Sequence, residues 1–77
     1  MSYAKAFNEL KKMGAPVFKN EDGMFISAEE NDDVIWADYY CFEFGVFGVN
    51  EKIEAVLSKN GLFSEWVNPG CVGIYKV

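Results

Sequence analysis

A pattern of helix-ending and turn-forming glycines, which occurs twice, constrains the fold of this chain most strongly. The motif Leu-x-Lys-x-Gly covers residues 10–14 and again residues 57–61, and in each copy another glycine follows nine residues later, at Gly23 and Gly70. With Lys5 and Lys52, the two copies share five identities at an offset of 47 residues. Glycine ends helices and forms turns in many unrelated chains. The pattern therefore predicts two α-β-β units without establishing a duplication.

The first unit is expected to begin with a helix over residues 3–13. Its apolar residues recur at helical spacing on one face: Tyr3, Ala6, Phe7, Leu10 and Met13. Gly14 then ends the helix, and Pro16 prevents it from restarting. Residues 17–19 and 24–28 read as two short strands around a polar turn at residues 20–23.

A long strand is predicted over residues 34–44, which are rich in β-branched and aromatic side chains. Neither of its alternating faces is purely polar, so we expect a bulge or a cover on both sides. Asn50 is placed to cap a second helix, which ends at Gly61. Residues 62–67 and 71–77 then form the closing hairpin around an Asn-Pro-Gly turn.

These segments fit one small domain over residues 1–77, because a chain of this length has room for one core. Thirteen aromatic side chains supply the buried area that a short chain otherwise lacks. We expect an α+β fold with the element order α-β-β-β-α-β-β. Its antiparallel sheet should carry both helices on one face.

The composition argues against several classes of function. The chain has no Arg and no His, and its net charge is −5. Direct nucleic-acid binding is disfavoured because phosphate neutralisation supplies most of that affinity. Without His the usual general base is missing, and two Cys fall short of a zinc site. We therefore predict a protein that is not an enzyme and holds no metal or cofactor.

The two cysteines are expected to be free thiols in a cytoplasmic protein. Cys41 and Cys71 both lie in strand-like segments, and two Cys in so small a cytoplasmic chain do not form a disulfide framework. The N-terminus enters a helical pattern directly, so we expect no signal peptide. No apolar run approaches the length of a membrane span.

The acidic residues are concentrated in one segment, residues 20–51, which carries nine Asp or Glu and no Lys. Seven aromatic residues are interleaved with them: Phe25, Trp36, Tyr39, Tyr40, Phe42, Phe44 and Phe47. Carboxylates on neighbouring strands and loops recur at roughly 5–7 Å, a spacing that imitates a row of phosphates. The segment favours a basic partner, and the simpler interpretation is a solvated face that maintains solubility.

Three smaller features each allow two interpretations. Residues 29–33 could form a Ca²⁺ loop, but they lack EF-hand spacing and are better read as a solvated connection. Asp38 among aromatics could be a catalytic acid with a raised pKa, but no second catalytic residue accompanies it. Trp66 could be an exposed interface anchor or could cover the edge of the small core.

Residues 59–77, with a helix-ending glycine and an Asn-Pro-Gly turn, resemble the C-terminal helix–glycine–hairpin of small uncharacterised phage and prophage proteins. The whole acidic, single-domain chain is similar in build to phage-encoded anti-defence proteins, including the anti-CRISPR group. The resemblance implies inhibition by occupying a nucleic-acid-binding surface. That group shares no common motif, so no functional residue is carried over from it.

We therefore expect a non-enzymatic inhibitor, in the cytoplasm of a bacterial host, that binds a basic nucleic-acid-binding protein or complex by charge mimicry. The residues predicted to bind this partner are Glu21, Asp22, Glu29, Glu30, Asp32, Asp33, Trp36, Tyr40 and Glu43. The alternative is a small structural or regulatory interaction module. Such a module could form a homodimer through an exposed strand edge or an aromatic patch.

Overall fold

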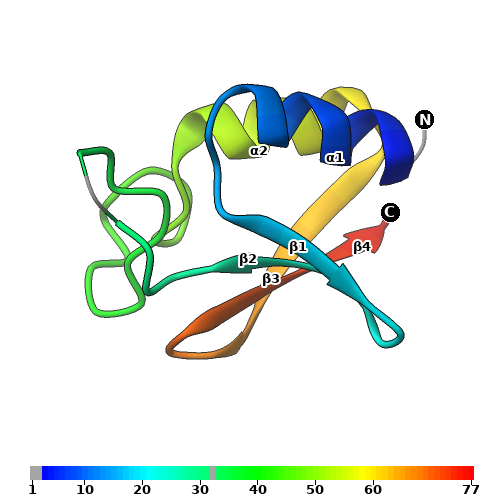
Figure 1. The fold of residues 1–77 in the computed structure, drawn as a ribbon. Helices are drawn as coiled ribbons and strands as arrows, with labels where there is room; N and C mark the ends of the chain where they lie inside the picture. Colours follow the sequence, from blue (N-terminus) through cyan, green and yellow to red (C-terminus); the bar gives the residue numbers. More distant parts are fainter. Residues whose placement is uncertain (1–2, 32) are drawn as a thin grey trace.

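The computed structural model describes residues 3–31 and 33–77. They form α1 (Tyr3–Lys12), β1 (Val17–Asn20), β2 (Gly23–Ser27), α2 (Glu51–Lys59), β3 (Leu62–Asn68) and β4 (Cys71–Lys76). The order α-β-β-α-β-β confirms the small α+β fold predicted from the repeated glycine pattern (Figure 1). None of the helices in the described ranges is long and apolar enough to cross a membrane.

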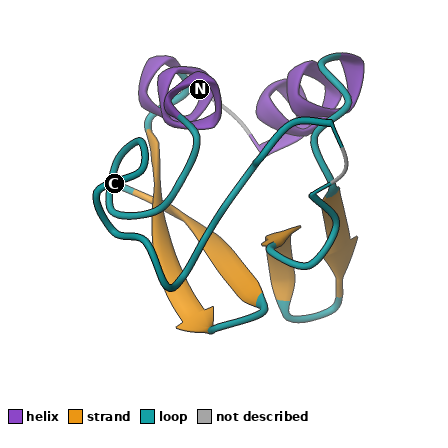
Figure 2. Ribbon diagram, turned by 90° about the vertical axis from the view of Figure 1, so that its left-hand side faces the viewer, coloured by secondary structure: helices purple, strands orange, loops and turns teal. Residues whose placement is uncertain are grey.

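The four strands form one antiparallel sheet in the order β1-β2-β4-β3. Each hairpin contributes two neighbouring strands, and the hairpins join where β2 pairs with β4, with Met24 opposite Ile74 and Ile26 opposite Val72. Both helices lie over the same face of the sheet (Figures 1 and 2). Among the described residues, neither helix nor loop covers the other face in these views.

The helices begin and end where the sequence predicts. The Asn50 side chain accepts a hydrogen bond from the Lys52 backbone N–H at 2.8 Å and so caps the start of α2. Gly14 and Gly61 follow the two helices with φ values of +87° and +71°. Only glycine adopts this left-handed conformation without steric cost, which explains why the same residue type ends both helices.

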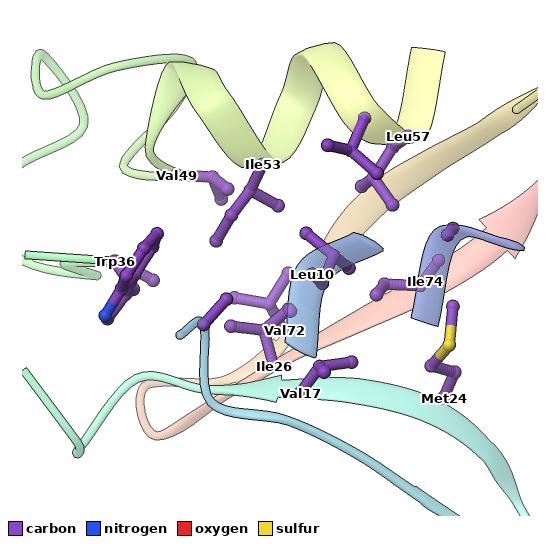
Figure 3. Packing of buried hydrophobic residues seen from close by; sticks show 14 of the residues in the cluster. Leu10, Val17, Met24, Ile26, Trp36, Val49, Ile53, Leu57, Val72 and Ile74 are labelled. Atoms are coloured by element: carbon purple, nitrogen blue, oxygen red, sulfur yellow. The ribbon is translucent and has the colours of Figure 1, made fainter. Parts of the chain in front are cut away.

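The core lies between the helices and the inward face of the sheet (Figure 3). Leu10 of α1 and Ile53 and Leu57 of α2 are fully buried against sheet residues such as Ile26 and Val72. Successive residues of a strand point to opposite faces, so each strand gives only alternate side chains to this layer.

The predicted strand at residues 34–44 is wrong. In this segment only Ala37 forms a bridge, an isolated one to Val49, and turns begin at Tyr39. β-propensity measures how well side chains pack on a half-buried sheet, and Asp38 and Glu43 fall on opposite alternating faces. No register would therefore bury one face cleanly, and the segment becomes part of a loop.

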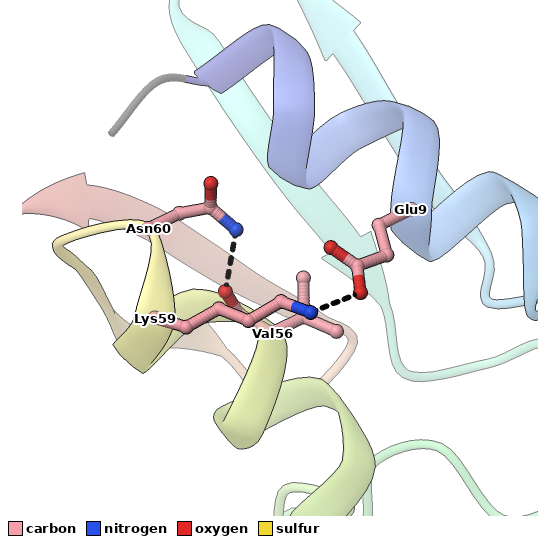
Figure 4. Close-up of polar contacts among 4 residues, drawn as sticks. All are labelled: Glu9, Val56, Lys59 and Asn60. Carbon is pink, nitrogen blue, oxygen red and sulfur yellow. Dashed lines mark hydrogen bonds and ion pairs between the residues drawn. The ribbon is translucent and has the colours of Figure 1, made fainter.

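Figure 4 shows two polar contacts, one at the end of α2 and one between α1 and α2. Asn60 is buried, and its side-chain Nδ2 donates a hydrogen bond to the Val56 carbonyl at 2.8 Å. The Lys59 ammonium of α2 and the Glu9 carboxylate of α1 form an ion pair at 2.5 Å across the helix surface. The first contact satisfies a buried donor, whereas the second is exposed to solvent and is correspondingly weak.

Replacement of Ile53 by alanine should destabilise the protein far more than loss of this ion pair. We expect Ile53→Ala to lower the free energy of unfolding by about 2–5 kcal/mol, because the side chain is fully buried and leaves a cavity. The control Glu9→Gln should cost less than about 1 kcal/mol. Urea unfolding followed by circular dichroism measures both values, and equal losses would contradict a core-dominated fold.

Candidate functional site

The loop over residues 28–50, which connects β2 to α2, is the largest irregular element of the described chain. We call it the 28–50 loop. It exceeds the length of about 12–15 residues beyond which unstructured connections in compact domains are uncommon and usually functional. Two isolated bridges, Ala37–Val49 and Val46–Val49, are its only strand-like pairings in the described part. Turn-type backbone hydrogen bonds, such as Asp38 N–H to the Gly48 carbonyl at 2.7 Å and Gly48 N–H to the Phe44 carbonyl at 2.8 Å, hold part of it, and side chains hold the rest.

Asn31 holds the first half of the loop. Its Nδ2 donates to the carbonyls of Ala28 at 3.2 Å and Ala37 at 2.9 Å, and its Oδ1 accepts from the Trp36 N–H at 2.8 Å. One amide thus satisfies three backbone groups that have no sheet partner. The indole of Trp36, only 8% exposed, packs into the edge of the core (Figure 3).

Asn50 joins the end of the loop to its middle. Its N–H donates to the Trp36 carbonyl at 2.9 Å, and its Nδ2 donates to the Ile35 carbonyl at 3.0 Å. The same side chain caps α2 through Oδ1. The position of residues 35–36 is thereby tied to the start of a helix.

Trp66 of β3 supports the second half of the loop. Its indole Nε1 donates to the Phe47 carbonyl at 2.8 Å, and its ring contacts Tyr39 edge-on with centroids 5.3 Å apart. Tyr39 in turn contacts Tyr40 and Phe42 edge-on at 5.3 and 5.5 Å. Trp66 is half-buried against the core, which confirms the interpretation that it covers the core edge.

The tip of the loop exposes an aromatic ring on an unfavourable backbone. Phe47 has φ +51°, the one positive φ of a non-glycine residue in the described chain, and its side chain is 76% exposed. At the neighbouring Gly48 a Cβ would lie 2.6 Å from the Asp38 carbonyl oxygen, so only glycine fits there. The left-handed conformation costs an aromatic residue about 1–2 kcal/mol, which the surrounding hydrogen bonds must offset.

The loop combines exposed apolar side chains with carboxylates. Tyr40 is 84% exposed, and Ile35 and Phe42 are about half exposed. The described acids on the loop are Glu29, Glu30, Asp33, Asp38 and Glu43, all exposed except the half-buried Asp38. The loop itself contains no Lys. Fixed exposure of aromatic rings beside like charges is typical of surfaces that bind another protein.

Two further contacts locate the acids on the surface. The Glu29 carboxylate packs against the β3–β4 turn, where a Cβ at Gly70 would lie 2.6 Å from its Oε2. Glu30 and Asp33 line a shallow cleft between the loop and the end of α1, together with Lys11. The carboxylates therefore spread along the side of the molecule where β2 ends and α2 begins.

The structure separates part of the predicted acidic surface. Glu21 and Asp22 lie in the β1–β2 turn, and the 28–50 loop begins at the other end of β2 (Figure 1). The five residues of β2 separate these ends by about 16 Å. The expectation that all acids of residues 20–51 fold near each other is wrong for this pair, because an extended strand keeps its ends apart.

Of the predicted aromatic anchors, Tyr40 is exposed and Trp36 is not. Because Trp36 is buried, it positions the loop and is not an exposed contact, which corrects the expectation for this residue. Phe47 is exposed but is not among the predicted contact residues, and the nearby glycines at 45 and 48 were the available signal for it. Asp32, also predicted to bind a partner, lies outside the described residues.

The described residues include no group of three Asp, Glu, Cys or His side chains that could hold a metal ion. Asp38 uses its Oδ1 to accept the Tyr40 N–H at 3.0 Å, which makes it a turn residue. Cys41 is exposed and Cys71 half-buried, both as free thiols, and burial raises the pKa of the Cys71 thiol.

No family model, curated protein or solved structure matches the chain.

Replacement of Asn31 by alanine should loosen the 28–50 loop. The change leaves two carbonyls and the Trp36 N–H without their partner, and we expect the free energy of unfolding to fall by about 1–3 kcal/mol. The matched control is Asn20→Ala, which removes a single exposed bond to the Asp22 N–H and should cost about 1 kcal/mol or less. Amide hydrogen exchange should also accelerate at Trp36; unchanged protection there would show that Asn31 does not hold the loop.

Replacement of Phe47 by asparagine should stabilise the protein. Asparagine tolerates the left-handed conformation, and the lost ring is mostly solvent-exposed, so the free energy of unfolding should rise by about 0.5–1 kcal/mol. Phe42→Asn, at an exposed position without a positive φ, should give no gain. Chemical denaturation compares the two; a loss at Phe47 as large as that at Phe42 would mean that the backbone there is not strained.

Proposed function

We propose that this protein is a non-enzymatic inhibitor of the phage anti-defence (anti-CRISPR-like) type. It would act in a bacterial cytoplasm by binding a basic, nucleic-acid-binding protein surface through the 28–50 loop. The observation that carries the proposal is the loop itself, which is held in one conformation while it exposes aromatic rings and carboxylates with no Lys among them.

Charge mimicry requires acidic groups where the partner normally holds phosphates. Glu29 is exposed next to the β3–β4 turn, Glu30 and Asp33 are exposed beside the end of α1, and Glu43 lies further along the same loop. Carboxylates accept the same Lys and Arg donors as phosphates do, and the net charge of −5 steers the protein towards a basic cleft. The partner would then be blocked by competition for its cationic side chains.

Aromatic rings add stacking contacts that carboxylates alone do not provide. Nucleic-acid-binding clefts stack bases on aromatic and Arg side chains, so an inhibitor gains by offering rings of its own. Tyr40 and Phe47 are the most exposed rings of the loop. Their fixed positions lower the entropy lost on binding, since the loop is already ordered by Asn31, Asn50 and Trp66.

Glu21 and Asp22, which lie in the β1–β2 turn away from the 28–50 loop, provide a matched control. We expect the double variant Glu29→Lys/Glu30→Lys to weaken partner binding at least about tenfold, because it reverses charge in the contact surface. Glu21→Lys/Asp22→Lys changes the net charge by the same amount, from −5 by four units to −1, at the far end of β2. That control should change binding only slightly, through long-range attraction.

The measurement uses the heparin-binding fraction of a bacterial lysate, which is enriched in proteins with nucleic-acid-binding surfaces, as the probe. Immobilised wild-type protein should retain a component that nucleic acid competes off and that elutes as salt is raised. The Glu29/Glu30 variant should not retain it, whereas the Glu21/Asp22 variant should. If both variants lost the component equally, its binding would depend on net charge alone. If both variants retained it, the proposed loop surface would be refuted.

A further inference from the structure

A half-open cavity of about 330 Å³ lies where the two hairpins of the sheet separate. β2 and β4 pair as far as Met24 and Ile74. Beyond this point Gly23 pairs only with β1 and Tyr75 only with β3, so the hairpins part. Gly23 has φ +138°, a conformation that favours glycine, and glycine has no side chain to fill the gap. The end of the β2–β4 pairing is therefore left open as a cavity.

Three elements each bring an aromatic ring to this cavity. Tyr3 comes from the start of α1, Phe25 from β2 and Tyr75 from β4. The start of α1, the β1–β2 turn and the end of β4 lie at one end of the molecule, opposite the 28–50 loop (Figure 1). Most of the lining atoms are apolar, and pockets for small ligands begin at about 300 Å³. The cavity therefore has the size and lining for a small molecule with one aromatic group.

Lys19 and Asp22 give the cavity wall one charge of each sign. Alternation along β1 places Lys19 on the same side as the buried Val17, and its ammonium lies 4.5 Å from the ring centroid of Phe7 on α1. Asp22 lies in the β1–β2 turn, where its N–H donates to Asn20 Oδ1 at 2.8 Å. Within residues 3–31 and 33–77 neither charged group forms an ion pair, so both can contact a ligand.

The two charges identify the ligand that suits the cavity. An anion would leave Asp22 unmatched and is repelled by the net charge of −5, and a cation would leave Lys19 unmatched. A zwitterion is neutral overall and matches both, its carboxylate with Lys19 and its ammonium with Asp22. We propose that the cavity binds a small aromatic zwitterion, of which a free aromatic amino acid is the simplest. Its ring would lie among Tyr3, Phe25 and Tyr75.

The affinity of such a site should be modest. Both charged side chains are exposed, and contacts between exposed charges contribute little. A ligand of this size should therefore bind with a Kd of about 0.1–1 mM. The cavity lies at the opposite end of β2 from the 28–50 loop, so this binding and the proposed partner binding are independent, and either can fail alone.

An NMR titration of the isotope-labelled whole protein with L-tryptophan tests the proposal. The backbone amides of Gly23 and Tyr75, which line the cavity, should shift and saturate. The amide of Phe47, in the 28–50 loop, should not shift. Two further probes each lack one charge, since indole-3-propionate has no ammonium and tryptamine has no carboxylate.

Neutral variants should discriminate among the three probes. Lys19→Gln should weaken L-tryptophan and indole-3-propionate roughly two- to fivefold and should not weaken tryptamine, because only a carboxylate loses its contact. Asp22→Asn should weaken L-tryptophan and tryptamine by a similar factor and should not weaken indole-3-propionate. Lys12→Gln and Glu21→Gln make the same charge changes at exposed residues that do not line the cavity, and should leave all three affinities unchanged.

Three outcomes would overturn the proposal. The first is the absence of saturable shifts at Gly23 and Tyr75 with L-tryptophan at about 10 mM, tenfold above the highest expected Kd. The second is equal weakening by the control variants, which would make the binding an effect of net charge alone. The third is uncharged indole binding as tightly as L-tryptophan, which would make the cavity a purely apolar site. The wild-type titration requires no variant, and the amide spectrum of each variant shows whether it is folded.

Discussion

The pairing of β2 with β4 is the contact on which the rest of the structure depends. It joins the two helix–hairpin units into one sheet, and its register sets Met24 against Ile74 and Ile26 against Val72. These four side chains all face the helices, so one pairing creates the floor of the core. A slip of β2 by one residue would turn Met24 and Ile26 towards solvent and bring Phe25 inward, where the space suits smaller aliphatic chains. The poor fit of an aromatic ring in the core therefore specifies the strand register as much as the hydrogen bonds do.

The same pairing explains why the molecule has two distinct surfaces. Both helices lie on one side of the sheet. The aromatic residues that alternate with the core therefore lie on the face that neither helix covers: Phe18, Phe25, Phe63 and Tyr75. The chain leaves β2 at the end opposite the β1–β2 turn, and the 28–50 loop must cross the side of the molecule to reach α2. The two surfaces adjoin at the end of β2, where the Glu29 N–H donates a hydrogen bond to Ser27 Oγ at 3.2 Å.

Local signals predicted the regular elements, whereas the 28–50 loop is held by side-chain and backbone contacts that have no simple sequence pattern. Gly14, Gly61 and Asn50 act within a few residues of their own position, so their effect is legible in the sequence. The conformation of residues 34–44 depends on backbone hydrogen bonds within the loop and on the side chains of Asn31, Asn50 and Trp66, of which only Trp66 comes from outside the loop. The aromatic content there resembles a strand because propensity does not distinguish packing in a sheet from packing in an ordered loop. Burial of Trp36 and exposure of Phe47 follow from those contacts and could not be read from composition.

The construction of the loop bears on what it can be for. If the 28–50 loop served only as a connection, a short turn would suffice, and a left-handed phenylalanine with an exposed ring would be an avoidable cost. The chain instead uses one buried tryptophan, one half-buried tryptophan and two asparagine side chains to maintain it. Such support restricts the loop to one conformation before any partner is met, which reduces the entropy lost on binding. The left-handed backbone at Phe47 and the hydrogen bonds around it are therefore the features of the loop on which the proposed binding role depends.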